Sequence, residues 1–302
     1  MGKSLSGRTP ARIEWPTIAV AVAIYGGFGL LTWWYHALPW WLVVPLAAYL
    51  LAWHGALQHE VVHGHPTPWP RVNEGLVFPI LWLWMPFRVY RETHLAHHND
   101  AALTDPVEDP ESFYVTPQDW ARLGLLSRAY LWILNTLAGR MVLGPFLSLW
   151  RLGRAEIGLV LAGDRRHLGI WAWHALSCAL VLGWVVGVCD IPALEYLAFF
   201  AYPGASFNLV RSFLEHQARP EVRERTAIVE SGPVMSLMFL NNNLHMVHHL
   251  EPGTAWYRLP ARYWQNREAI LEHNGGYLLP GYGWIALRYL FWPKESPVHR
   301  LS

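Results

Sequence analysis

Long apolar stretches separated by short turns dominate the chain. A membrane-spanning helix needs about 20 mostly apolar residues, and four stretches approach or exceed this length. They run over about Trp15–His36, Trp40–Leu57, Leu168–Val188 and Ala193–Leu214. A short turn containing a proline separates the first stretch from the second, and another separates the third from the fourth. The pattern therefore predicts four transmembrane helices arranged in two hairpins.

Three further apolar stretches fit a bilayer less well. Leu76–Phe87 is short and broken by prolines, Leu125–Trp150 contains arginines and glycines, and Gly281–Trp292 is short and aromatic. We expect interfacial or re-entrant helices at these places. A fifth span over Leu125–Trp150 is the alternative, but it would invert the second hairpin.

The distribution of basic residues argues against such an inversion, because neither hairpin turn contains Lys or Arg. Loops on the cytoplasmic side of a membrane carry an excess of Lys and Arg. Both termini and all long connections are therefore expected to be cytoplasmic, and the first span is expected to be retained rather than cleaved as a signal peptide. The residues concerned are Lys3, Arg8, Arg12, Arg71, Arg88, Arg91, Arg151, Arg154, Arg165, Arg166, Arg211, Arg219, Arg223 and Arg225.

The composition supports a membrane protein. Of the 302 residues 53% are hydrophobic, 19 are Trp and only 15% are charged, whereas about a quarter are charged in a typical soluble domain. A net charge of +1 gives no reason to expect binding to nucleic acid. The two cysteines, Cys178 and Cys189, form no C-x-x-C motif, so we expect neither a disulfide framework nor a cysteine metal site. No linker divides the chain, and we predict a single domain over residues 1–302.

Nine of the sixteen histidines are grouped at the predicted cytoplasmic ends of the spans. Residues three and four apart share one face of a helix, so each group can direct two or three imidazoles toward one place. Imidazole suits Fe, Zn, Cu and Ni, and zinc is saturated by about four ligands. Nine histidines exceed one zinc site and suit two metal ions with four or five ligands each. The candidates are His59, His63, His94, His97, His98, His216, His245, His248 and His249.

The other seven histidines are His36, His54, His65, His167, His174, His273 and His299. We expect His54 to point away from the face that carries His59, and His65 to support the site or add a ligand. His167, His273 and His299 are expected at the surface. Polar lining or a pH-sensing patch would also explain histidines near a membrane, but neither requires the repeated H-x-x-H-H spacing.

Polar residues beside the candidate ligands are expected to orient them. Metal-bound imidazoles usually donate their other N–H to a carboxylate or a carbonyl. Glu60, Glu215 and Asn243 adjoin candidate ligands. Among the acidic residues after the second histidine group, those that are candidates to orient it or to cap helices are Asp100, Asp105, Asp109 and Glu111.

The three histidine groups resemble the histidine boxes of the membrane fatty acid desaturase/hydroxylase superfamily. They read H-x(3)-H, H-x(2)-H-H and H-x(2)-H-H, and the resemblance extends over about residues 40–260. Short sequence segments next to the boxes also match those of the superfamily. They are Arg91-Glu92-Thr93, Asn243-Leu244 and Glu251-Pro252. The resemblance implies an all-α integral membrane fold of four transmembrane helices in two hairpins, with a cytoplasmic helical cap that holds two non-haem iron ions. It also implies that His216 is a ligand, whereas Ser212 stands where some members have an Asn that contacts a metal through water.

The implied activity is O2-dependent desaturation of a fatty acyl chain, carried by a lipid or by coenzyme A. Hydroxylation or ketolation of an alkane, a carotenoid or another lipid at the same type of site is the first alternative, and a non-enzymatic membrane metal-binding protein is a remote one. The acyl chain is expected between the second and fourth spans, where Trp53, Gly204 and Ala205 are candidate lining residues.

The electrons for this chemistry are expected from a separate carrier. The chain has no His-Pro-Gly-Gly haem motif and no Gly-x-Gly-x-x-Gly dinucleotide motif. A ferredoxin, a rubredoxin or a protein of the cytochrome b5 type would supply them. Arg88, Arg91, Arg219, Arg223 and Arg225 are candidates for docking an acidic carrier.

Overall fold

The computed structural model describes residues 12–300, which form helices almost throughout. Two compact units are present. One comprises residues 12–92 and 145–208 and is called the hairpin unit below. The other comprises residues 93–144 and 209–300 and is called the histidine unit. Three helices, α4 (Phe87–His97), α7 (Leu137–Leu161) and α10 (Tyr202–Glu215), continue from one unit into the other.

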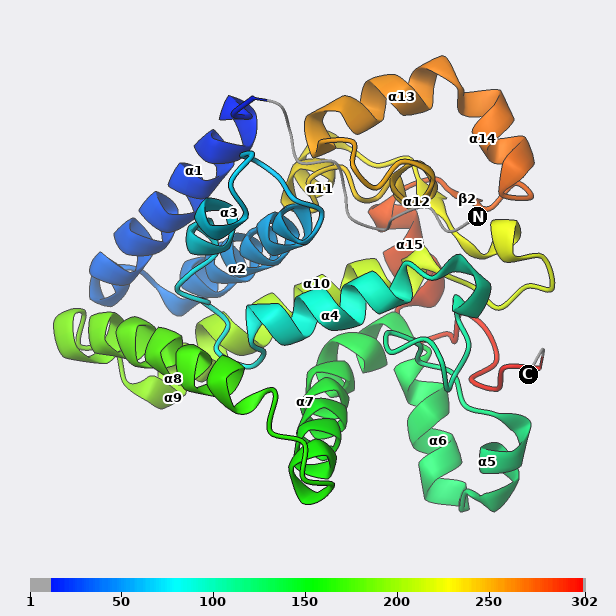
Figure 1. Ribbon diagram of the computed structural model, residues 1–302, viewed down its shortest axis with the longest axis horizontal. Helices are drawn as coiled ribbons and strands as arrows, with labels where there is room; N and C mark the ends of the chain where they lie inside the picture. The colour runs from blue at the N-terminus through cyan, green and yellow to red at the C-terminus, as the bar shows by residue number, and fades with distance from the viewer. Residues whose placement is uncertain (1–11, 301–302) are drawn as a thin grey trace. The chain divides into compact units, whose positions relative to one another are not determined.

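The hairpin unit contains the apolar helices. Besides its parts of α4, α7 and α10, its elements are α1 (Trp15–Trp33), η1 (Tyr35–Ala37), α2 (Trp40–Val62), α3 (Pro70–Leu76), α8 (Leu168–Leu182), η3 (Gly183–Val188), α9 (Ala193–Tyr196) and η4 (Leu197–Ala201). Helices α1 and α2 pack against each other (Figure 1). Apolar side chains such as Ile24, Phe28, Val43 and Leu51 are buried, as the predicted hairpin requires.

Polar contacts join the turns of the two expected hairpins. The Tyr35 hydroxyl donates to Glu195 over 2.5 Å, and His36 Nε2 lies 3.1 Å from the carbonyl oxygen of Cys189. One turn deeper, Trp184 Nε1 donates to Thr32 Oγ1 over 2.9 Å. Both turns therefore lie at the same end of the hairpin unit. Cys178 and Cys189 are free, as expected.

Three described helices are long and apolar enough to cross a membrane: α1, α2 and the segment Leu168–Val188, in which α8 continues into the π-helical η3. The fourth expected span is built as α9, the π-helical η4 and α10. It is not one of the three candidates, and its role as a span stays a prediction.

The expected interfacial helix over Leu76–Phe87 is wrong. Helix α3 ends at Leu76, and an irregular segment of turns and bends follows up to Pro86. Two prolines interrupt the helical pattern, since each removes a backbone donor. Side chains from other elements form hydrogen bonds with the backbone of this segment instead. Ser177 Oγ accepts from the Ile80 N–H over 2.7 Å, and the Tyr196 hydroxyl donates to the Leu81 carbonyl over 2.5 Å.

The other two uncertain stretches are helical. Leu125–Trp150 becomes α6 (Leu125–Leu134) and the first half of α7, with a break at Asn135 and Thr136. The Thr136 hydroxyl caps the new helix, because it accepts from the Gly139 N–H over 3.0 Å. The stretch Gly281–Trp292 contains α15 (Tyr282–Tyr289).

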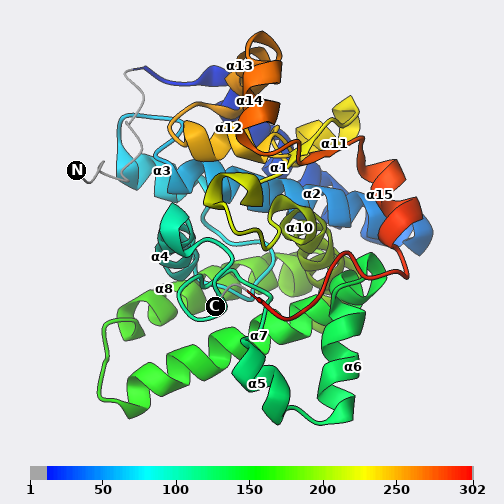
Figure 2. The same cartoon turned by 90° about the vertical axis from the view of Figure 1, so that its right-hand side faces the viewer.

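The histidine unit consists of short helices around a small apolar core, and Figure 2 shows several of them. A parallel two-stranded sheet pairs Ile228 with Leu278. Ile228, Leu244, Met246, Val247 and Tyr263 are buried together in the core. Its remaining elements are η2 (Asp100–Ala102), α5 (Pro117–Arg122), η5 (Val222–Arg225), β1 (Ile228–Val229), α11 (Pro233–Met238), α12 (His245–Leu250), η6 (Trp256–Arg258), α13 (Leu259–Gln265), α14 (Arg267–His273) and β2 (Leu278–Leu279).

Candidate functional site

Four histidines converge inside the histidine unit. His97 comes from α4, His216 follows α10, and His245 and His249 come from α12. One ring nitrogen of each lies within 4.8 Å of those of the others. The Nε2 atom of His216 is 3.0 Å from that of His97 and 3.1 Å from that of His245, and the Nε2 atoms of His245 and His249 are 3.1 Å apart. We call these residues the four-histidine group.

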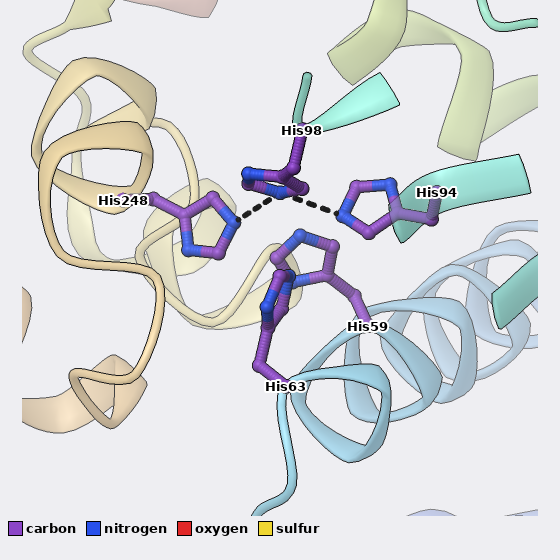
Figure 3. A group of neighbouring side chains, drawn as sticks. All are labelled: His59, His63, His94, His98 and His248. Carbon is purple, nitrogen blue, oxygen red and sulfur yellow. Dashed lines mark hydrogen bonds between the residues drawn. The ribbon is translucent and has the colours of Figure 1, made fainter. Parts of the chain in front are cut away.

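A second group lies in the same unit and comprises His94, His98 and His248. The Nε2 atom of His98 is 3.1 Å from the Nε2 atoms of both His94 and His248. Figure 3 draws these three rings with their nitrogens turned toward one another. All three side chains are buried. We call these residues the three-histidine group.

The core of the histidine unit positions the third histidine box, which comprises His245, His248 and His249. Asn243 forms a two-way link to β1: its carbonyl accepts from the Val229 N–H over 2.8 Å, and its side-chain amide donates to the Val229 carbonyl over 2.7 Å. Met246 and Val247 are buried in the core. Helix α12 therefore turns its apolar face to the core and presents His245, His248 and His249 on the opposite side.

Backbone pairing fixes His216. The carbonyl of Glu215 accepts from the Ala227 N–H, and the Gln217 N–H donates to the Arg225 carbonyl, both over 2.9 Å. His216 and Thr226 thus face each other in an antiparallel bridge immediately after α10 ends. Lys294 Nζ donates to the His216 carbonyl over 2.5 Å.

Two acidic residues of the loop after α4 form hydrogen bonds with histidines of the second histidine box, which comprises His94, His97 and His98. His97 Nδ1 is 2.9 Å from Asp109 Oδ1, and His94 Nδ1 is 2.9 Å from Glu111 Oε1. Asp109 also accepts from the backbone N–H groups of Thr104 and Glu111, which orders the loop. Burial alone would raise the pKa of Glu111, but the nearby His97 and His94 outweigh it and hold that pKa well below its usual value. Glu111 is therefore ionised and accepts a hydrogen bond from the Nδ1–H of His94.

A similar contact orients His245. Its Nδ1 lies 3.1 Å from Asn242 Oδ1 and 3.2 Å from Glu215 Oε1. Glu215 also pairs with Arg211 at 2.9 Å. Burial raises the pKa of Glu215 to about 7, against the opposing effect of Arg211. The expectation that Glu215 supports the site thus has a geometric basis.

The arrangement fits a metal ion because Nε2 atoms of several rings converge. Burial is the main cause that lowers the pKa of His94 and of His245 below the ordinary value, so both rings are neutral. Each donates its Nδ1–H to an oxygen, which leaves a lone pair on Nε2. These lone pairs point at the Nε2 atoms of His98 and His216. A cation bound between such nitrogens would use them as ligands.

The surroundings of His97 also favour a positive charge on or beside its ring. Its burial would lower the pKa, yet Glu111 and Asp109 prevail and raise the pKa of His97 to about 9. In the absence of a metal this ring therefore takes up a proton. A metal ion that binds to Nε2 replaces that proton.

His59 and His63 form a pair of their own in the hairpin unit. They lie one turn apart at the end of α2, with ring centroids 4.9 Å apart, and both are buried. Figure 3 draws them on the last turns of α2. His63 is the C-terminal cap of the helix, and Glu60 Oε1 is 4.0 Å from His59 Nδ1. As the spacing predicts, the two rings are neighbours.

Three of the other histidines have partners of their own within the hairpin unit. His65 Nδ1 pairs with Glu14 at 3.0 Å, the Tyr25 hydroxyl contacts His54 Nε2 at 3.2 Å, and His174 Nε2 meets the Leu83 carbonyl at 3.0 Å. His273 is exposed, as expected.

Two surface expectations need correction. His299 is 2% exposed and its Nε2 lies 3.1 Å from Thr104 Oγ1, because the C-terminal segment pairs with residue 115 and folds inward. His167 is half-buried between Glu92 and Glu156, at 3.0 Å from each. Neither lies on an open surface.

The candidate lining residues have different surroundings. A Cβ atom at Gly204 would lie 2.4 Å from Leu51 Cβ, so this glycine permits close packing of helices. Ala205 is buried, and Trp53 is half-buried against Tyr49. A lining role for these three residues stays a prediction. Arg225 cannot dock a carrier as expected, because it is buried and donates to the carbonyls of Leu103 and Arg219.

Lys294 was not expected at the site. It lines a cavity of about 40 Å³ together with His97, Glu111, Ser212 and His216, large enough for water. Its Nζ is 2.8 Å from Glu295, and burial lowers the pKa of Lys294. Lys294 is 78 residues from His216 in the sequence, and no motif marks it, so only the fold reveals the contact.

Comparison with known proteins agrees with the histidine geometry. The family model described as fatty acid desaturase matches residues 32–280, which include all nine candidate ligands. No curated protein matches the chain.

Proposed function

Because this chain belongs to the fatty acid desaturase family, we propose that it desaturates a fatty acyl chain with O2 at a histidine-bound pair of iron ions. The observation that carries the proposal is the convergence of buried and half-buried imidazole nitrogens in two groups. The family makes the protein an oxidoreductase-type enzyme that acts on lipid.

The nine histidines divide naturally between two metal ions. The four-histidine group offers four ligands to one ion. The three-histidine group offers three to the other, and we propose that His59 and His63 complete its set. Both rings are buried and share one face of α2, and without them the second ion would have fewer ligands than its neighbour. Imidazole suits Fe, Zn, Cu and Ni alike; iron is proposed because of the family.

When bound, the two iron ions supply the power to activate O2 and to remove hydrogen from an unactivated C–H bond. The chain's own residues prepare the site for this chemistry. Glu111 and Asp109 hold the rings of His94 and His97, while Asn242 and Glu215 hold His245, so that Nε2 remains free for a ligand bond. Burial of the histidines excludes bulk water. Lys294 fixes the backbone of His216.

The proposed topology keeps four spans and a cytoplasmic histidine site. The contacts between the Tyr35–His36 turn and the Cys189–Glu195 turn support two hairpins that open toward the same side. The basic residues lie away from these turns, which by the positive-inside rule supports turns outside the cytoplasm. Electrons are proposed to come from a separate carrier, of the ferredoxin, rubredoxin or cytochrome b5 type.

Lipid analysis of cells that express the protein tests the proposal. Mass spectrometry should show fatty acyl chains that have lost two hydrogens, only in the presence of O2 and only in cells that express the protein. His248→Ala should abolish the product while the protein still inserts, and His273→Ala, at an exposed position, should retain it. A gain of one oxygen atom instead would identify a hydroxylase or ketolase, and oxygen-independent behaviour would exclude an oxygenase.

A further inference from the structure

An apolar groove lies in the hairpin unit where α7 ends and α8 begins. Its volume is about 370 Å³. The lining includes Ile157, Val160, Leu161, Leu168 and Trp171, and the first four of these are strongly exposed. Figure 2 shows the two helices and the short connection between them. A groove of this size and polarity suits an acyl chain better than it suits water.

The position of the groove relates it to the bilayer surface. Helix α8 begins the candidate span Leu168–Val188, and the groove is built around its first turn. Trp171 donates its indole N–H to Glu156 over 2.8 Å. A tryptophan with an apolar ring and a bonded N–H at the start of a span is typical of the membrane interface. The groove is therefore expected at the level of the lipid headgroups.

The charges around the groove are unequal. Its acidic residues already have partners: Asp164 pairs with Arg166 at 2.6 Å, and Glu156 pairs with His167 at 3.0 Å. Glu92 also contacts His167, at 3.0 Å, so two carboxylates share this one histidine. Arg154 and Arg165 are exposed cations next in sequence to the lining residues Gly153 and Asp164, and they remain without a carboxylate partner among residues 12–300.

We propose that this groove binds one acyl chain of an anionic phospholipid, with the lipid phosphate against Arg154 and Arg165. The apolar lining takes the chain, and the two free guanidinium groups take the charge. Basic residues beside a span attract anionic headgroups, and each contributes roughly fivefold to the binding constant. The site is separate from the histidine groups, and lipid retention does not depend on turnover.

Native mass spectrometry of the full chain can test this proposal. The protein is reconstituted in nanodiscs of phosphatidylcholine with 30% phosphatidylglycerol. The lipids that stay bound to the protein after it is released from the nanodisc in the mass spectrometer are counted. We expect one retained phosphatidylglycerol per chain. Arg154→Gln combined with Arg165→Gln should lower its retention about 25-fold. The control pair Arg122→Gln and Arg223→Gln removes the same charge elsewhere and should leave retention unchanged.

A second pair of variants tests the groove itself. Gly153 lines the groove and Gly158 does not, and a Cβ atom at either glycine meets no other atom within 4 Å. Gly153→Leu should fill the groove and abolish retention, while Gly158→Leu should keep it.

Three results would overturn the proposal. Equal retention of phosphatidylcholine and phosphatidylglycerol, unaffected by the arginine variants, would remove the charge selection. A dimer in detergent that Gly153→Leu dissociates would make the groove an interface between copies. Oxidation of the retained phosphatidylglycerol itself would make the groove a route for substrate.

Discussion

The two histidine groups differ in how much of the molecule they need. The four-histidine group is built entirely within the histidine unit, and oxygen atoms hold both His97 and His245. In the three-histidine group, Glu111 holds His94. It depends, in our proposal, on His59 and His63 of the hairpin unit to complete its ligand set.

This difference assigns the two metal positions different roles in the fold. The first is fixed by the local structure around α12 and β1. The second would take two of its ligands, His59 and His63, from the end of α2. Metal binding at either position would stabilise the folded state, because a ligand that binds only the native state adds to its stability.

The largest effect is expected from removing a ligand of either group. His245→Ala and His248→Ala should each reduce lipid oxidation below detection, because the site needs both metal positions. The measurement is product formation in membranes that contain equal amounts of inserted protein. Activity at the level of the His273→Ala control would show that the third box is misplaced.

The double variant His59→Ala/His63→Ala separates the two groups. It should lower the iron content from about two ions per chain to about one, since the four-histidine group is left intact. Elemental analysis of purified protein measures this ratio. If both ions were lost, or both retained, the division of ligands between the two positions would be incorrect.

Changes next to the ligands should have intermediate effects. Asp109→Asn and Glu111→Gln keep the size of each side chain but remove the charge that orients His97 and His94. Loss of such a contact typically lowers metal affinity about 10- to 100-fold. Competition with a chelator measures this loss, and Asp119→Asn in exposed α5 is the matched control. Unchanged affinity in both variants would mean that these carboxylates do not support the ligands.

The metal affinity should also depend on pH. Protonated His97 must lose its proton before a metal binds, and its pKa without metal is raised to about 9 by Glu111 and Asp109. Affinity for the metal should therefore weaken as the pH falls below 9, by about tenfold per pH unit for this one group. Titration at several pH values checks this slope, and a flat profile would count against His97 as a ligand.

The smallest effect concerns the support of the third box. Asn243→Ala removes the buried bond to the Val229 carbonyl and leaves that acceptor unsatisfied, which costs about 1–3 kcal/mol of stability. Thermal unfolding of the purified protein measures the loss. Asn266→Ala, at an exposed position, should change stability much less; equal effects would contradict the supporting role.

The sequence predicted the histidine groups more successfully than it predicted their surroundings. The spacing in α4 and α12 fixes which rings share a face, because helical geometry alone determines it. Asp109 and Glu111 were candidates among four acidic residues, but their partners depend on the turn that Thr104 and Asp109 form. Lys294, His299 and Arg225 are buried only because distant segments fold over them, and local sequence carries no sign of that.

The helices show the same limit. The periods and lengths of α1, α2 and α8 are visible in the sequence, and all three are confirmed as candidate spans. The segment 77–86 is apolar, but its prolines and the hydroxyl groups of Ser177 and Tyr196 favour an irregular path of turns and bends over a helix. Those hydroxyl groups lie about a hundred residues away in sequence, beyond the reach of local patterns.

The iron content of the unaltered protein tests the central claim most directly. Protein purified from iron-replete cells should contain about two iron ions per chain, and reconstitution of metal-free protein with iron should restore O2-dependent lipid oxidation. One iron ion per chain, or a protein that is active with zinc alone, would contradict the account of two metal positions formed by nine histidines.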